Sequence, residues 1–271
     1  MKLLYFVLLF FLFSMARAQF PEAPPFAESH LSSLYEEFRE QGVPEPALRR
    51  IFEFLLEASG KRVLVKTNED SYSTLKLANI RYAGVADFSL PSNIKRFYLL
   101  DLKQGTVERY YVSHGKNSGG KWAGIFSNKD NSHMSSLGLY MTGYTYKSAA
   151  FGGQALKIFG LDPTNDNAFS RSIVVHQASY MTPEFMAERK TTPGDTERMG
   201  RSFGCFAFDP SYAPEIIQKL RGGALLYAYT KGVEKLIAER ADYQVSRMVK
   251  PQNDHVISTE IEDQQRENFN R

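Results

Sequence analysis

Cysteine is almost absent from this sequence, and the one exception is informative. Cys205 is the single cysteine among 271 residues. It cannot form an internal disulfide, and paired cysteines of the kind that bind zinc are missing as well. Exported proteins usually pair their cysteines. In an exported chain, a lone thiol therefore indicates either a small buried apolar side chain or a reactive group.

The sequence also lacks an apolar run long enough to span a membrane. Its longest run, Leu3 to Phe13, covers eleven residues after Lys2, whereas a spanning helix needs about 20. Ala16-Arg17-Ala18 follows with the small-x-small pattern of a signal-peptide cleavage site. We predict a signal peptide over residues 1–18, a mature chain that begins at Gln19 without a stable membrane span, and a periplasmic or extracellular location. An uncleaved anchor is the alternative.

A strong excess of charge is missing too. The whole chain carries a formal charge of +3, from 33 basic and 30 acidic residues. Cleavage of the predicted signal peptide removes Lys2 and Arg17, which leaves 31 basic against 30 acidic residues, a net charge of +1. A balance this even gives no electrostatic footprint for nucleic acid. We therefore expect no nucleic-acid partner.

Several catalytic motifs are absent. The five histidines are scattered and form no His-Glu-x-x-His pattern, so the sequence predicts no metal site. The glycine pairs at 119–120, 152–153 and 222–223 lack the spacing of a phosphate-binding loop. A serine-centred Gly-x-Ser-x-Gly turn is missing as well, and we predict no cofactor. Papain-type enzymes place their cysteine before the histidine, whereas here His176 precedes Cys205.

Hydrophobic periodicity predicts a mainly β fold with a few helices (α+β). Helical spacing predicts two helices between residues 31 and 59, and a period of two from about residue 80 predicts strands. The predicted strands cover residues 80–88, 96–102, 106–112, 137–142, 154–161, 172–176 and 224–229. A short amphipathic helix covers 213–220, and 183–190 is a mixed segment with helical character. We divide the chain into the signal peptide (1–18), a leader with a helical pair (19–60), one domain (61–230) and a charged C-terminal extension (231–271) that ends in disorder.

Two residues at the edges of predicted strands could perform nucleophilic acyl transfer. Cys205 lies in the run Gly200-Arg201-Ser202-Phe203-Gly204-Cys205, and His176 ends the β-branched run Ile173-Val174-Val175. The thiolate is the nucleophilic form of cysteine, and an imidazole can take its proton. Gly204 allows a tight turn that aims consecutive N–H groups at one point, as an oxyanion hole requires.

Each of these residues also has a plainer interpretation. Cys205 could be an inert buried thiol, His176 a hydrogen-bonded core histidine, and Gly204 merely part of a turn. His114 and His133 lie in polar loops, so we expect both to be solvated rather than catalytic.

These residues resemble the L,D-transpeptidase (YkuD-like) catalytic domain, in particular its divergent murein branch with a Gly-Arg-Ser-x-Gly-Cys motif. The resemblance rests on His176 and on the motif that ends at Cys205, and it extends over about residues 80–230. Supporting stretches lie at residues 126–129, 132–138, 165–168 and 222–226. The resemblance implies an L,D-transpeptidase-like β-sandwich or barrel in the catalytic domain 61–230, preceded by the N-terminal helical pair.

The resemblance implies an exported cysteine acyltransferase whose partners are peptidoglycan stem peptides. Cys205 would displace the terminal D-alanine and form a thioester with the diaminopimelate residue, and an amine of a second stem would resolve it. His176 would be the general base, the N–H groups of Gly204 and Cys205 the oxyanion donors, and Ser202 would line the site. The alternatives are an L,D-carboxypeptidase that uses water, a catalytically silent wall-binding scaffold, and a cysteine hydrolase on another fold.

The sequence departs from the common family motif at two positions. Phe203 stands where the common motif has histidine, and Ala207 stands where it has arginine. Another group must therefore hold the substrate carboxylates. We assign this role to Arg201, because arginine can grip a carboxylate at two points, and keep His133 as a second candidate for substrate binding. The long gap before the motif predicts an added lid over residues 182–200.

Overall fold

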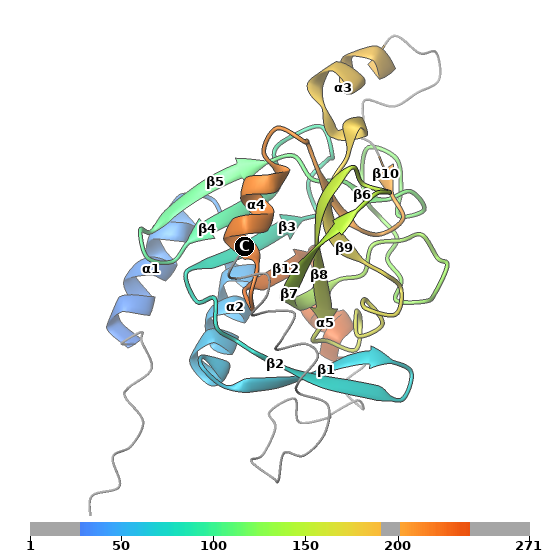
Figure 1. The fold of residues 1–271 in the computed structure, drawn as a ribbon. Helices are drawn as coiled ribbons and strands as arrows, with labels where there is room; N and C mark the ends of the chain where they lie inside the picture. The colour runs from blue at the N-terminus through green and yellow to red at the C-terminus, as the bar shows by residue number, and fades with distance from the viewer. Residues whose placement is uncertain (1–27, 191–200, 239–271) are drawn as a thin grey trace, which may run out of the picture.

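Two N-terminal helices precede the sheet in the computed structural model, which describes residues 28–190 and 201–238 (Figure 1). Helix α1 covers Glu28–Glu40 and α2 covers Glu45–Ala58. Apolar side chains recur every three or four residues in α2, so one face of this helix is buried. The predicted helical pair is confirmed. Both helices belong to the same hydrophobic core as the sheet.

One curled sheet of eight strands forms the centre of the described chain (Figure 1). Its order is β11-β9-β8-β7-β12-β3-β4-β5. The strands are β3 (Tyr82–Asp87), β4 (Phe97–Asp101), β5 (Thr106–Tyr110), β7 (Gly138–Ser148), β8 (Gly153–Gly160), β9 (Val174–Gln177), β11 (Phe206–Phe208) and β12 (Leu225–Tyr229). Strand β9 runs parallel to β11, and β3 runs parallel to β12. The predicted fold class, mainly β with a few helices, is confirmed.

The four remaining strands of the described residues form two small sheets of two strands each. An antiparallel pair joins β1 (Arg62–Asn68) to β2 (Ser71–Lys76), and a parallel pair joins β6 (His114–Gly115) to β10 (Arg201–Ser202). We did not predict β1 and β2. The alternation is weak in β2, where Leu75 is the only buried residue, whereas Val63 and Val65 of β1 do alternate with less buried neighbours. The remaining helices are the 3-10 turn η1 (Ser179–Met181), α3 (Pro183–Lys190), α4 (Ala213–Leu220) and α5 (Val233–Ala238). Helix α5 lies where we predicted only a charged extension.

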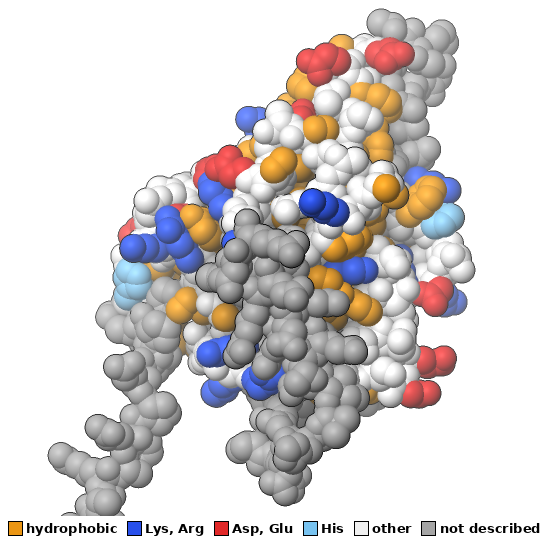
Figure 2. All heavy atoms as spheres, in the orientation of Figure 1, with side chains coloured by type: hydrophobic (Ala, Val, Ile, Leu, Met, Phe, Trp, Pro, Cys, Tyr) orange, Lys and Arg blue, Asp and Glu red, His pale blue; other side chains and the backbone are white. Residues whose placement is uncertain are grey.

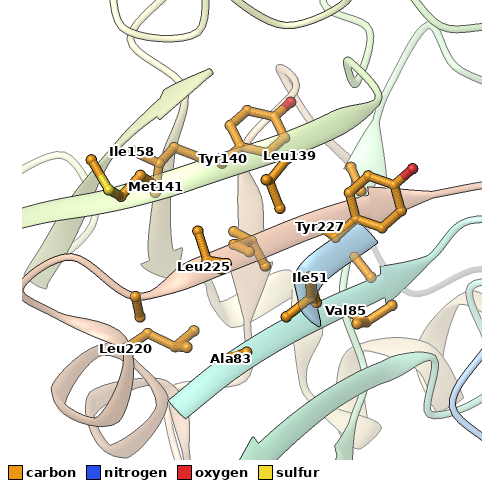
Figure 3. Close-up of a cluster of buried hydrophobic side chains, with 14 of the residues drawn as sticks. Ile51, Ala83, Val85, Leu139, Tyr140, Met141, Ile158, Leu220, Leu225 and Tyr227 are labelled. Carbon is orange, nitrogen blue, oxygen red and sulfur yellow. The ribbon is translucent and has the colours of Figure 1, made fainter. Parts of the chain in front are cut away.

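The core lies between the sheet and the helices. Figure 3 shows Ile51 of α2 close to side chains of β3 and β12, including Val85 and Tyr227. Helix α2 contacts β12, and α4 contacts β3, β8 and β9. Each large apolar side chain buried in this way stabilises the fold by about 1.5–3 kcal/mol. Strand β9, which carries His176, is therefore held by a neighbour on each side and by α4.

Some predictions fall outside the part that the structure describes. These are the signal peptide, the start of the mature chain, residues 191–200 of the predicted lid and the predicted disordered tail. Within residues 28–190 and 201–238, no helix is both long and apolar enough to cross a membrane. The same residues contain no group of three or more histidine, cysteine or acidic side chains that could hold a metal ion.

Candidate active site

The thiol and the imidazole come from two adjacent strands at one edge of the large sheet. Cys205 directly precedes β11, whose residue Ala207 pairs with His176 of β9. Cys205 packs with Ala155 and Val174 in a small cluster that is separate from the main core. Because alternate residues of a strand share a face, Val174 and His176 point to the same side of the sheet. The structure thus places Cys205 and His176 on one side of the sheet.

Both side chains line one cavity of about 550 Å³. Cys205 is 8% exposed and His176 is 3% exposed, so both are buried but reach this space. The cavity is lined by Ala150, Phe151, Arg171, Ser172, Ile173, His176, Gln177, Ala178, Ser179, Tyr180, Ser202, Phe203 and Cys205. A peptide that enters it would therefore meet the sulfur and the imidazole together.

His176 is held in one orientation and one tautomer. Its Nδ1 lies 2.7 Å from the backbone oxygen of Gln177, which can only accept a hydrogen bond. The neutral ring therefore carries its proton on Nδ1 and its lone pair on Nε2. Phe151 stacks on the imidazole, with ring centroids 3.8 Å apart. Burial lowers the pKa of His176, so the ring is neutral near pH 7 and can accept a proton.

Cys205 is protonated in the resting protein. Burial raises the pKa of its thiol to about 11. The N–H of Val174 and the positive charges of Arg171 and Lys157 act in the opposite direction and stabilise the thiolate. The sulfur lies 3.7 Å from the backbone oxygen of Ser172, which can accept the S–H. A thiol in this state needs a base to take its proton before it can act as a nucleophile.

The motif loop before Cys205 is fixed by Ser202. The Ser202 hydroxyl donates to the Cys205 oxygen at 2.7 Å and accepts the N–H of Gly204 at 3.1 Å. Gly204 has a φ of +117°, and a Cβ there would lie 2.7 Å from the Met134 oxygen. Glycine is therefore required at this position. Because Ser202 occupies the Gly204 N–H, the oxyanion role of that N–H stays a prediction.

The two residues predicted to bind substrate lie near the motif loop in different ways. His133 stacks on Phe203, with ring centroids 4.4 Å apart, and Phe203 lines the cavity although it is 60% exposed. Near β10, hydrophobic, basic and histidine side chains gather at one edge of the visible face (Figure 2). The backbone of Arg201 pairs with His114, but its side chain lies outside the described part. Both binding assignments stay predictions.

The expectation that His114 is solvated is wrong, because this side chain is fully buried. Arg96, also fully buried, donates from Nη2 to His114 Nδ1 at 2.8 Å. Because arginine only donates, Nε2 carries the ring proton and faces the Gly119 oxygen at 3.4 Å. The polar neighbours of His114 in the sequence gave no sign of this partner, which lies 18 residues away.

Sequence reasoning missed two cations near the thiol, Arg171 and Lys157. Arg171 lines the cavity, and Lys157 lies in β8, the strand next to β9. A signal for each was present in the sequence. Lys157 interrupts an apolar strand between Ala155 and Leu161, and Arg171 stands just before the predicted strand that ends at His176.

A buried thiol and a neutral imidazole that line one cavity define a candidate cysteine-nucleophile site on a mainly β fold. The family model of the L,D-transpeptidase catalytic domain matches residues 61–229, and the chain belongs to this family. No curated protein matches the chain at a significant level.

Several similar chains among the solved structures are L,D-transpeptidases. L,D-transpeptidase 3 from Mycobacterium tuberculosis is 14% identical, with a TM-score of 0.35 over 59% of this chain and 65% of that one. An L,D-transpeptidase from Mycobacterium smegmatis is 13% identical, with a TM-score of 0.32 over 59% of this chain and 64% of that one. The chain thus spans slightly less than two thirds of these structures, and the family assignment rests on the family model.

Proposed function

We propose that the protein is an exported cysteine acyltransferase that cross-links peptidoglycan stem peptides by L,D-transpeptidation. The observation that carries this proposal is the shared cavity, which holds the Cys205 thiol and the neutral His176 with its Nε2 lone pair. Membership of the L,D-transpeptidase family supports the choice of substrate. The predicted signal peptide over residues 1–18 supports a periplasmic or extracellular location, where this substrate lies.

In the proposed acylation step, His176 Nε2 takes the thiol proton as Cys205 Sγ bonds to the carbonyl carbon of the diaminopimelate residue. The carbonyl electron pair moves to oxygen and gives a tetrahedral intermediate. As this collapses, the bond to the terminal D-alanine breaks and the imidazolium protonates the leaving amine. A thioester remains on Cys205. The N–H of Cys205 is the proposed oxyanion donor, and the Gly204 N–H joins it when it releases Ser202.

In the second step the amine of another stem attacks the thioester. His176 takes the proton of that amine, the new amide bond forms, and the sulfur leaves and is reprotonated by the imidazolium. Arg171 and Lys157 stabilise the departing thiolate, because their charges lower the pKa of Cys205. With water in place of the amine, the same steps would give L,D-carboxypeptidase activity.

Mass spectrometry of the intact protein tests this proposal. We expect a tetrapeptide stem, or a carbapenem, to add one acyl group to the wild type and none to Cys205→Ala. One similar structure is of an L,D-transpeptidase in complex with the carbapenem imipenem. Equal unfolding temperatures of the two proteins would show that the variant is folded. A wild type that neither probe modifies would contradict the proposal and favour a silent scaffold, and analysis of the muropeptide products would separate transpeptidation from hydrolysis.

Arg201 is the proposed contact for a substrate carboxylate. Arg201→Ala should raise KM for the stem peptide far more than it lowers kcat, because the guanidinium would bind substrate and transition state alike. Arg39→Ala, on the exposed surface of α1, is the matched control and should leave both constants unchanged. A variant with lowered kcat and an unchanged KM would refute this assignment.

A further inference from the structure

Lys157 lies on the same face of the sheet as the thiol. In the ladder between β8 and β9, Lys157 pairs with Val174, and Ala155 pairs with His176. Cys205 packs against Ala155 and Val174, one residue from each strand. Because Lys157 and Ala155 are two residues apart in a regular strand, their side chains share a face. Lys157 and His176 therefore belong to neighbouring cross-strand pairs, on the face of the sheet against which Cys205 packs.

The ammonium of Lys157 is placed between aromatic rings. Its Nζ lies 5.0 Å from the ring centroid of Tyr146 and 5.2 Å from that of Phe169. Burial lowers the pKa of Lys157, and the charge of the Cys205 thiolate acts in the opposite direction. A partly buried cation is normally paired with an anion, because loss of water penalises the charged form.

No carboxylate among residues 28–190 and 201–238 fills that role. Lys66 lies 3.8 Å from a carboxylate oxygen of Asp166, and Lys219 lies 2.6 Å and 2.7 Å from those of Glu108 and Glu215. The Lys157 ammonium, by contrast, lies over the two rings and forms no ion pair with a carboxylate, and its three N–H donors have no hydrogen-bond acceptor in the described chain. These donors remain available to an incoming group.

Arg171, the other cation whose charge reaches the thiolate, already uses four of its five N–H donors within the protein. Its guanidinium donates to four oxygens of the segment 127–136. The acceptors are the backbone oxygens of Ser127 and Met134 and the hydroxyls of Ser132 and Ser136. Arg171 therefore positions that segment beside the cavity, whereas Lys157 can bind an anion without losing a protein partner.

We propose that Lys157 is a specificity-determining residue whose ammonium binds a carboxylate of the acyl-donor peptide beside Cys205. The inference rests on the proposed function and names the charge that the donor must carry. The proposed donor has two carboxylates near the bond that breaks. One is the terminal carboxylate of the leaving amino acid, and the other is the side-chain carboxylate of the diaminopimelate residue that Cys205 attacks. The ammonium recognises either by the same charge-assisted hydrogen bond.

The test measures acylation of Cys205 by three synthetic tetrapeptide donors. One has both carboxylates free, one carries an amide on the leaving residue, and one carries an amide on the diaminopimelate side chain. The variants are Lys157→Met, which keeps the length of the side chain without its charge, and Lys157→Arg, which keeps the charge. Lys147→Met, on an exposed lysine of the same β7–β8 hairpin, is the control.

For the donor with free carboxylates, Lys157→Met should raise KM roughly tenfold to a hundredfold, as loss of a hydrogen bond between charged groups does. Lys157→Arg should restore most of the affinity, and Lys147→Met should match the wild type. The penalty of Lys157→Met should vanish for the one amidated donor that lacks the recognised carboxylate. The identity of that donor reveals which carboxylate the lysine binds.

Two outcomes would overturn the inference, and they differ from a failure of the proposed function. An equal penalty for all three donors, or none for any, would show that Lys157 recognises no donor carboxylate. A wild type that no donor acylates would overturn the proposed function, and this inference with it. Thermal unfolding and iodoacetamide labelling of Cys205 check each variant. If Lys157→Met does not fold, Lys157→Gln replaces it in the same comparison.

Discussion

Two buried histidines lie in strands that pair with β10 and β11, the short strands on either side of the motif loop. They differ in whether both ring nitrogens have a partner within the protein. His114 in β6 is bonded at both ring nitrogens, to Arg96 and toward the Gly119 oxygen. His176 in β9 donates from Nδ1 to its neighbour's oxygen, and its ring lines the cavity that Cys205 shares. Both are buried, so burial alone does not distinguish a base from a structural residue. The lone pair on Nε2 of His176 is the feature that supports its proposed role as the base.

The cations near the two histidines also differ in whether their N–H donors are used within the protein. Arg96 is fully buried, and burial lowers its pKa to about 9, but it donates to the oxygens of Leu90 and Val112 as well as to His114. Its donors are used inside the fold. Near Cys205, Lys157 keeps its donors free. We interpret the first arrangement as structural support and the second as a place for substrate.

The largest expected effect separates the two histidines. His176→Ala should lower the acylation rate of Cys205 about 10²–10⁴-fold, as loss of a general base does. His114→Ala should instead reduce the free energy of unfolding by about 1–3 kcal/mol, because it leaves a buried donor of Arg96 unpaired. The measurements are acylation followed by mass spectrometry and denaturant unfolding. If folded His176→Ala were acylated at the wild-type rate, His176 would not be the base.

The next largest effect tests the hydrogen bond from Arg96 to His114. Arg96→Met should destabilise the protein by about 2–4 kcal/mol, because His114 Nδ1 and the oxygens of Leu90 and Val112 lose their donor together. Arg39→Met is the control, since the exposed pair with Glu36 should contribute about 1 kcal/mol at most. Denaturant unfolding gives both values. If the folded Arg96→Met protein lost acylation as severely as His176→Ala, the site would depend on His114 directly.

The sequence was informative where a pattern reports on local structure. Alternation located β4, β5, β8, β9 and β12 closely, and helical spacing located α1, α2 and α4. It missed the hairpin of β1 and β2, in which polar residues such as Ser71 and Thr74 dilute the period of two. It also missed α5, a short helix in a charged segment.

The candidate site was predictable only in part. Cys205 and His176 could be found, because one is unique and the other ends an apolar run, and the structure places both at one cavity. The role of Lys157 depends on strand register, which pairs it with Val174, and register cannot be read from either strand alone. The burial of His114 likewise depends on Arg96, which reaches it from a different strand end.

The smallest effect concerns pH and tests whether the buried His176 is neutral. Burial lowers the pKa of His176 below its ordinary value of about 6.5, so below that pH the unfolded chain binds a proton that the folded protein resists. Stability from this group is complete above about pH 6.5 and is lost as the pH falls, by at most about 1.4 kcal/mol per pH unit. Denaturant unfolding of the wild type and His176→Ala between pH 7.5 and 5 should therefore show a steeper decline in the wild type. Equal slopes would mean that burial does not lower the pKa of His176. A shallower decline in the wild type would mean that the buried ring is charged, and an imidazolium could not take the proton of Cys205.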